Sequence, residues 1–385
     1  MKTNFIPLLP CILITVFSCG RPPAAESPPL PRPGETTPPA RPGLATAPDP
    51  ETSAAEMLTL HWTYRAAGAV AAPPAVIGDF IIVVTKTAEV TALSPAGQKR
   101  WSVNLGEART TQTVLAAPAI AGGNLYLGTD SGFLYALDPA TGKAIWTAAL
   151  GAEIRNPPAA AENCLFVLTQ PDGVIHALNP VSGAEIWKSE KTNRTDGPPA
   201  TNGREIAFGN CDAALHVFSA ADGKRLHRIE LGEDSQVAGG AALSGNLAFV
   251  GTRNGRVVCA DIHEGKIVWA EKFSEGEIFT TPAASGRRVV FAAADGVVHA
   301  TDRDTGKSLW RFQAGNDPQS PVIAGDRAVV SAAGVVYILD LATGAKRASR
   351  EVSDFITAPA VWRGMILVGT DDGRVVAFGK TGEIR

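Results

Sequence analysis

An eleven-residue pattern recurs along most of this chain and restricts what the chain can fold into. Its copies at 136–146, 177–187 and 300–310 read ALDPATGKAIW, ALNPVSGAEIW and ATDRDTGKSLW. Weaker copies are marked by the glycine alone, and the equivalent glycines are Gly97, Gly142, Gly183, Gly223, Gly265, Gly306, Gly344 and Gly382. They stand 38 to 45 residues apart. A repeat of this period indicates a solenoid, an array or a propeller.

Each repeat contains four short apolar segments joined by turns. In the repeat at 117–150, the turns carry the glycines, asparagines and aspartates that hairpins need, as in the triplets Gly122–Asn124 and Asp130–Gly132. The segments between them are rich in Val, Ile, Leu and aromatic residues, which favour strands. No stretch shows sustained helical periodicity. Four antiparallel strands in about 40 residues are typical of a propeller blade.

Eight blades can be counted along the chain. Their inner strands are expected to begin near Pro74, Ala117, Pro158, Pro199, Gly240, Pro282, Pro321 and Pro359. The last blade has no room for a fourth strand before the chain stops, whereas Leu60–Arg65 precedes the first blade as an isolated strand. Residues 58–66 are therefore expected to complete blade eight, which removes the two open sheet edges. The predicted fold class is all-β: an eight-bladed β-propeller of four-stranded antiparallel blades, closed by the N-terminal strand.

The tryptophans follow the same register. Four residues after the repeat glycines stand Trp101, Trp146, Trp187, Trp269 and Trp310, with His227 and Ala348 in the two remaining places. Trp62 fills the eighth place, in the closing strand. A cofactor site would not use one residue type around a whole ring. We interpret these indoles as structural side chains that dock neighbouring blades, because large aromatic groups dominate burial.

The N-terminal residues indicate export. An apolar run from Phe5 to Phe17 is too short to span a membrane and predicts a signal peptide over residues 1–18. The run ends at Ser18-Cys19, which resembles a bacterial lipobox and implies lipidation of Cys19; the alternative is an ordinary cleaved signal with a chance cysteine. Residues 19–56 are rich in proline and predict a disordered linker. The propeller domain is then expected at 57–385.

The composition excludes several functions. A net charge of -3 gives no basic face for a nucleic-acid partner. The five cysteines form no Cys-x-x-Cys motif, so they indicate neither a zinc site nor a redox pair.

The pattern Ala-x-Asp-x-x-Thr-Gly-x-x-x-Trp resembles the PQQ-type repeat of eight-bladed propellers, and this resemblance covers about residues 58–385. A lipid-anchored propeller of this kind resembles the BamB family, which assists β-barrel insertion at the bacterial outer membrane. The resemblance implies a non-catalytic scaffold in the cell envelope: an outer membrane lipoprotein facing the periplasm that binds a β-barrel insertase through loops on one face.

Three residues correspond to the binding loops of that family. Arg194, in the loop 192–199, matches the family's arginine, and Asp196 lies beside it. Gln236 and Ala238 stand in the apparent places of the family's acidic residues, with Asp234 nearby. The resemblance thus implies partner binding by Arg194, Asp196 and Asp234.

The other large class with this repeat is the quinoprotein dehydrogenases. These enzymes use an adjacent cysteine pair against PQQ, a calcium site and long insertions that build a pocket, and this chain has no Cys-Cys pair and regular repeat spacings. We therefore expect no catalytic residue, no enzyme activity and no cofactor. Two alternatives stay open: an envelope propeller that binds a polysaccharide or an enzyme, and a degenerate quinoprotein that still binds PQQ.

No metal site is expected. His176, His216 and His299 occupy the same place in their repeats, but equivalent places in adjacent blades are about 10 Å apart, too far to share one metal. Asp302, Asp304 and the pair Asp371-Asp372 lack the spacing of a calcium loop and stand where turns need local hydrogen bonds.

The connections between blades are mostly acidic. Ten of the thirteen charged residues that we place there are Asp or Glu. These connections line one face of a propeller, so that face is expected to be negative. It can be an ordinary solvated surface or a docking surface, because recognition often lies on loops of a rigid scaffold.

Overall fold

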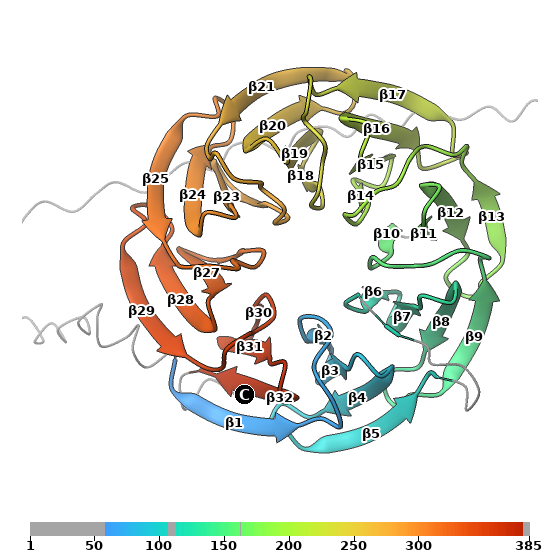
Figure 1. The fold of residues 1–385 in the computed structure, drawn as a ribbon. Coiled ribbons are helices and arrows are strands. Elements are labelled where there is room, and N and C mark those ends of the chain that lie inside the picture. The colour runs from blue at the N-terminus through green and yellow to red at the C-terminus, as the bar shows by residue number, and fades with distance from the viewer. Residues whose placement is uncertain (1–57, 107–112, 115, 162, 380–385) are drawn as a thin grey trace, which may run out of the picture. The chain divides into compact units, whose positions relative to one another are not determined.

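The computed structural model describes residues 58–106, 113–114, 116–161 and 163–379, which form thirty-two strands in eight four-stranded sheets arranged as a ring (Figure 1). This confirms the predicted eight-bladed propeller. The predictions for residues 1–56, including the signal peptide, the lipidated Cys19 and the linker, lie outside the described residues. Within the described ranges, no helix has the length and apolarity needed to cross a membrane.

The blades are numbered in chain order, and each has an inner strand, two middle strands and an outer strand. Blades one and two comprise β2 (Ala75–Ile77), β3 (Phe80–Val84), β4 (Glu89–Leu93), β5 (Lys99–Asn104), β6 (Ala119–Ala121), β7 (Asn124–Gly128), β8 (Phe133–Leu137) and β9 (Ala144–Ala149). Blades three and four comprise β10 (Ala159–Ala161), β11 (Cys164–Thr169), β12 (Val174–Leu178), β13 (Glu185–Lys188), β14 (Ala200–Thr201), β15 (Glu205–Gly209), β16 (Ala214–Ser219) and β17 (Arg225–Glu230).

The second half of the ring repeats this order. Blades five and six comprise β18 (Ala242–Ser244), β19 (Leu247–Gly251), β20 (Arg256–Asp261), β21 (Lys266–Lys272), β22 (Ala283–Ser285), β23 (Arg288–Ala292), β24 (Val297–Asp302) and β25 (Ser308–Gln313). Blades seven and eight comprise β26 (Val322–Ala324), β27 (Arg327–Ala332), β28 (Val335–Asp340), β29 (Lys346–Glu351), β30 (Ala360–Trp362), β31 (Met365–Gly369), β32 (Arg374–Phe378) and β1 (Leu60–Arg65).

The closure predicted from the sequence is present. Strand β1 pairs antiparallel with β32, from Leu60 opposite Phe378 to Arg65 opposite Arg374. Blade seven adds a further contact, because the Arg350 guanidinium donates a hydrogen bond of 2.9 Å to the carbonyl of Leu58. The two ends of the propeller therefore meet in one sheet.

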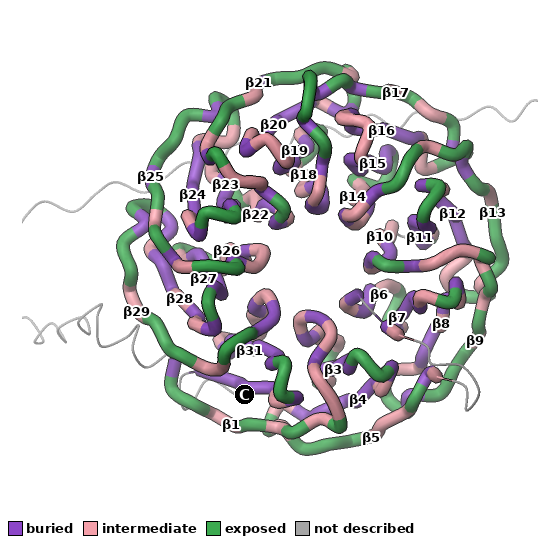
Figure 2. The backbone as a smooth tube through the Cα atoms, viewed as in Figure 1, coloured by how far each residue is buried: buried purple, intermediate pink, exposed green. Residues whose placement is uncertain are grey.

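The burial of each strand follows from its place in the blade. The middle strands are buried along nearly their whole length, as in β15, where all five residues are buried. Each sheet packs between two neighbouring sheets, so both faces of its middle strands need apolar side chains. The outer strands instead alternate between exposed and half-buried residues, as in β9. Figure 2 shows this change from buried middle strands to an exposed rim.

In blades one to seven, the repeat segment forms the turn before the outer strand. In blade six the Asp302 carboxylate accepts hydrogen bonds from the backbone N–H of Asp304 and from both the N–H and hydroxyl of Thr305. Gly306 closes the turn with a φ of +71°, a conformation that favours glycine. The Asp302 carboxylate thus serves the turn itself, as the local hydrogen-bonding interpretation predicts.

The repeat tryptophan and the repeat glycine meet across the blade boundary. The indole of Trp62 lies over Gly97, and that of Trp310 lies over Gly344. A Cβ added to either glycine would come within 2.5 Å and 2.6 Å, respectively, of the nearest indole atom. Five of these indoles also donate Nε1–H to a backbone carbonyl in the next blade's turn; they are Trp62, Trp101, Trp146, Trp269 and Trp310. Only glycine leaves room for the ring, so the indole and the glycine together join neighbouring blades.

Trp187 and His227 continue the series. The indole of Trp187 lies over Gly223, at 2.3 Å from the position of an added Cβ. His227 occupies the same place over Gly265, and its Nε2 donates a 3.1 Å hydrogen bond to the carbonyl of His263. A smaller aromatic ring therefore fills the boundary between blades four and five.

Candidate functional site

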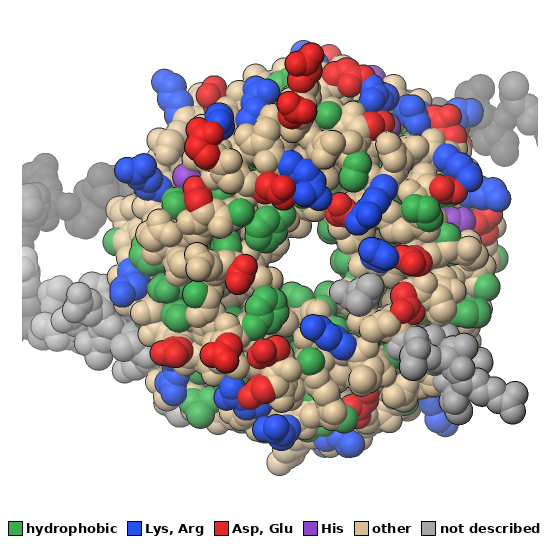
Figure 3. All heavy atoms as spheres, in the orientation of Figure 1, with side chains coloured by type: hydrophobic (Ala, Val, Ile, Leu, Met, Phe, Trp, Pro, Cys, Tyr) green, Lys and Arg blue, Asp and Glu red, His purple; other side chains and the backbone are tan. Residues whose placement is uncertain are grey.

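The connections between blades share one face of the ring with the turns that join the middle strands. The Leu150 N–H bonds to the carbonyl of Gly132 in such a turn, and the Ile154 N–H bonds to that of Thr129. Figure 3 shows acidic and basic side chains mixed on the face toward the viewer, around an opening at the centre. The acidic side chains predicted for the connections are thus interrupted by basic ones.

A chain of ion pairs crosses from blade three to blade six. The Arg194 guanidinium donates to Asp196 at 3.0 Å, and the same carboxylate lies 3.4 Å from Arg253. Arg253 also bonds to Glu277 at 3.0 Å. The Asp196 hydrogen bond raises the pKa of Arg194 above its ordinary value. Four alternating charges thus link two blade connections with a turn of blade five, and two of them are the predicted Arg194 and Asp196.

The backbone around Arg194 is held from both sides. The Gln170 side-chain amide donates to the carbonyl of Thr195, whose hydroxyl donates to the Gly209 carbonyl at 2.6 Å. The N–H of Cys211 bonds to the Arg194 carbonyl at 3.0 Å. Thr195 is buried, whereas 57% of the Arg194 side chain is exposed. The loop is therefore fixed while the guanidinium faces solvent.

A recess of about 380 Å³ lies beside Arg194. It is lined by residues of two connections and one turn, among them Glu153, Arg155, Gln170 and Pro171. Arg155 bonds to Glu153 at 2.6 Å and keeps 47% of its side chain exposed. Two exposed arginines thus border one recess, an arrangement suited to a carboxylate, because guanidinium groups bind carboxylates with paired hydrogen bonds.

Asp234 lies apart from this network. It stands exposed in the connection between β17 and β18, in a left-handed conformation with a φ of +56°. Among the described residues, no side-chain hydrogen bond or ion pair joins it to Arg194 or Asp196. The link is through the backbone, since the N–H of Arg253 bonds to the carbonyl of Gln236 at 2.8 Å. The structure therefore brings together two of the three predicted partner-binding residues.

A second cavity, of about 350 Å³, opens next to the recess and shares Arg155 with it. Its walls are mostly alanine and proline from the connections before the inner strands, together with Phe355, which is 43% exposed. Asn156 also lines it, and the buried Nδ2 of that side chain has no partner among the described residues. An apolar cavity with one free amide donor thus adjoins the charged recess.

Sequence reasoning missed Arg253 and Phe355. Arg253 had a detectable signal, because its turn reads Thr-Arg-Asn-Gly where the turns at 129–132 and 370–373 have Asp after the Thr. Phe355 had none, since an aromatic residue in a connection can be buried or exposed. Their contribution depends on which connections lie together in space.

The three histidines considered as metal ligands lie buried in separate blades. His176 bonds to Glu185 at 2.7 Å and to Thr169 at 3.3 Å, and His216 bonds to Asn210 at 2.8 Å. Within the described part of the chain, no three His, Cys, Asp or Glu side chains cluster as a metal site would require. Each ring instead belongs to its own blade.

Acid is expected to destabilise the propeller through its buried histidines. Burial lowers the pKa of His216 and His299 below 6.5. Their stabilising effect is therefore complete above about pH 6.5 and falls as the pH drops towards the folded-state pKa. His263 acts in the opposite sense, because its hydrogen bond to Glu205 raises its pKa. Its contribution is present below about pH 6.5 and is lost as the pH rises through the raised pKa.

The measurement is the free energy of unfolding in urea between about pH 7 and 5. His299→Phe should reduce the loss of stability in acid, by at most about 1.4 kcal/mol per pH unit for one proton. His263→Asn should increase that loss. Curves that stay parallel to that of the unchanged protein would contradict both assignments.

The matching family model and the most similar relatives carry the same family name. The family model described as "Outer membrane protein assembly factor BamB" matches residues 86–237 and 212–385. The chain is 26% identical to the BamB assembly factor of Salmonella typhimurium, over 79% of this chain and 83% of that protein. It is 28% identical to that of Xanthomonas campestris, over 79% and 80%.

Solved structures agree on the fold. The crystal structure of BamB from Moraxella catarrhalis superposes with a TM-score of 0.72 at 23% identity, covering 84% of this chain and 98% of that one. A computationally designed protein, Ika8, superposes with a TM-score of 0.74 at 18% identity, covering 84% and 99%. At these identities the likeness concerns the propeller fold.

Proposed function

The chain belongs to the family of the outer membrane protein assembly factor BamB, and we propose that it acts in outer membrane protein assembly as a binding scaffold without catalysis. The support is the family match over residues 86–237 and 212–385 and the relatives that carry this name. The protein is then anchored at the outer membrane through a lipid on Cys19 and faces the periplasm.

The proposed binding surface is the Arg194 face. The single observation that carries it is the exposed guanidinium on a fixed backbone, at the end of the ion-pair chain through Asp196 and Arg253. The proposed partner is an envelope protein of the β-barrel insertase kind. Its acidic side chain would enter the recess between Arg155 and Arg194, while an apolar side chain would fill the adjoining cavity beside Phe355.

Asp234 is assigned to the rim of this surface. It is exposed and lies in the connection whose backbone bonds to Arg253. A rim charge mainly affects how fast a partner associates and how strongly salt weakens binding. Replacing Asp234 should therefore change the salt dependence more than the affinity.

The test is copurification of the β-barrel insertase from cross-linked, detergent-solubilised membranes. Arg194→Glu should lower recovery of the insertase by about tenfold or more, because a reversed charge faces the partner's carboxylate. Arg287→Glu is the matched control, since Arg287 is 72% exposed and pairs with Asp302 in another turn.

Equal recovery with Arg194→Glu and Arg287→Glu would remove the proposed surface. Recovery of other envelope proteins alone, with no insertase, would remove the assembly function itself. Cys19→Ser tests the anchor separately, because an unlipidated protein should move from the membrane to the soluble periplasmic fraction.

A further inference from the structure

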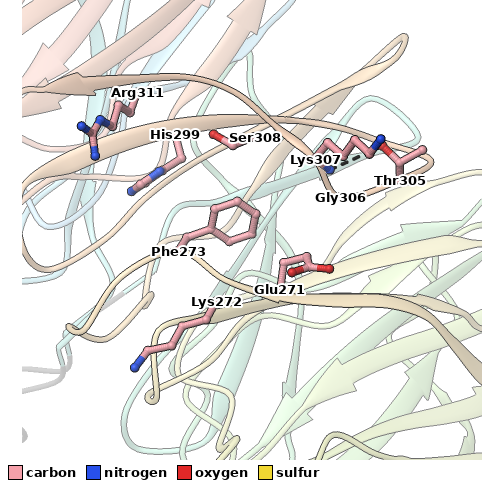
Figure 4. Close-up of a pocket in the computed structure, with 9 residues that line it drawn as sticks. All are labelled: Glu271, Lys272, Phe273, His299, Thr305, Gly306, Lys307, Ser308 and Arg311. Atoms are coloured by element: carbon pink, nitrogen blue, oxygen red, sulfur yellow. Dashed lines mark hydrogen bonds between the residues drawn. The ribbon is translucent and has the colours of Figure 1, made fainter.

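A groove of about 410 Å³ lies between the outer strand β21 of blade five and strands β24 and β25 of blade six, away from the Arg194 recess. Figure 4 shows the side chains that line it. Phe273 and His299 form its floor, and Lys307 and Arg311 lie along its blade-six side. The proposed insertase surface does not use this groove.

His299 has polar atoms that the fold leaves unpaired. Its side chain is only 6% exposed, and its ring stacks on Phe291 at 5.4 Å and meets Phe273 at 5.7 Å. No hydrogen bond to this imidazole is present among the described residues, and its Nε2 is buried without a partner. A buried polar group without a partner is unfavourable, so native structures rarely leave one unpaired.

The equivalent histidines show what is missing. In blade three the Nδ1 of His176 bonds to Glu185, the first residue of the outer strand. Ser308 is the first residue of the outer strand in blade six, and it does not bond to His299. A carboxylate at the position of the Glu185 side chain is therefore absent beside His299.

The second partner is also absent. In blade four the Nε2 of His216 bonds to Asn210, the first residue of the turn between the middle strands. Ala293 begins the same turn in blade six, as its N–H bond to the carbonyl of Val297 shows. Alanine offers no polar side-chain atom. Blade six thus lacks both of these partners. Asp295 keeps the place of Asp212, which bonds to His216 at 3.3 Å, but its carboxylate accepts hydrogen bonds from Ser274 and the Val297 N–H instead of from His299.

The groove also carries two basic side chains that are not in ion pairs. Arg311 stands directly opposite His299 in the register of β24 and β25, so the two side chains are neighbours on one sheet face. Neither Arg311 nor Lys307 forms an ion pair within the described ranges. Lys272 is paired with Glu275, and Glu271 is the one acidic residue of the groove lining.

We propose that this groove binds a carboxylate side chain of an acidic peptide segment. Arg311 supplies a charge-assisted hydrogen bond, the His299 imidazole donates its N–H, and Phe273 packs against the aliphatic part of the bound residue. Such a ligand would occupy the place that Glu185 fills beside His176 in blade three. The exposed outer strand β25 lets the peptide backbone lie along the rim.

The probe is a blocked hexapeptide with glutamate at alternate positions, titrated into the folded propeller at neutral pH and low salt. The readout is the imidazole proton resonances of His299, identified by their absence in His299→Phe. We expect these resonances to shift saturably. Arg311→Gln should weaken the peptide affinity by about tenfold, the usual effect of losing one charged hydrogen bond.

Three controls make the result specific. The same hexapeptide with glutamine in place of glutamate should not shift the His299 resonances. His176→Phe removes a histidine whose nitrogens are already paired, and Arg363→Gln removes an exposed arginine of blade eight; both should leave the affinity unchanged. Fixed His299 resonances, equal binding of the glutamine peptide, or unchanged affinity in Arg311→Gln would each overturn the proposal.

Discussion

Trp310→Ala is expected to lower the free energy of unfolding by about 3–5 kcal/mol, the usual cost of deleting a large buried aromatic side chain. The indole is 7% exposed, lies over Gly344 of the next blade and donates Nε1–H to the carbonyl of Leu341 at 3.0 Å. The substitution therefore opens a cavity at a blade boundary and leaves a buried carbonyl without its donor. Urea denaturation followed by tryptophan fluorescence and circular dichroism measures the change.

Two variants separate this contact from the general cost of losing an indole. Trp362→Ala removes the one tryptophan outside the repeat register, which is half-buried beneath the Arg363 side chain, and should cost less. His227→Trp restores the repeat residue over Gly265 and should stabilise the boundary between blades four and five. If Trp310→Ala costs no more than Trp362→Ala, the indole–glycine contact does not join the blades.

Deleting residues 58–66 is expected to have the largest effect on the whole ring. The deletion removes β1, exposes the edge of β32 and takes the Trp62 indole from Gly97. Domains are stable by only about 5–15 kcal/mol, so losing a complete strand and a blade boundary removes much of that margin. The unpaired edge also favours association between molecules. Light scattering after gel filtration and thermal melting measure both effects.

A permuted chain provides the control. Because β1 pairs antiparallel with β32, the same segment can be moved behind the C-terminus and reach its place through a hairpin. This variant has the same composition as the original protein and should recover a monomeric ring with a similar melting temperature. A deletion variant that remains monomeric and melts unchanged would show that β1 is dispensable for closure.

The fold could be predicted because its determinants repeat. The turn from Asp302 to Gly306, with its local hydrogen bonds and its glycine at positive φ, has counterparts in the six other blades where the structure describes this segment, so it could be recognised in the sequence. The isolated strand around Trp62 then identified the closure, since only one blade lacked an outer strand. Each of these signals lies within a short segment of the sequence, and its repetition along the chain makes it easier to recognise.

The site could be predicted only in part, because its geometry is not local. Arg194 and Asp196 are two residues apart, so their contact is visible in the sequence. Arg253 is 57 residues from Asp196 in the sequence, and the two side chains come into contact only because the blades pack side by side. The unpaired imidazole of His299 is still harder to predict from the sequence, because it results from the absence of hydrogen-bond partners. A sequence pattern reports which residues are present more readily than which bonds they fail to make.

The pairing of β1 with β32 also has a consequence for how the chain folds. Leu60 pairs with Phe378, near the other end of the chain. Strand β1 is therefore synthesised first but finds its partner strand only when almost the whole chain is available. Contacts between such distant residues are slow to form, and unpaired strand edges invite misassembly in the meantime. A chain of this topology therefore depends on remaining unaggregated until its last strands are made. The closing of the ring by β1 is therefore expected to be the last step of folding.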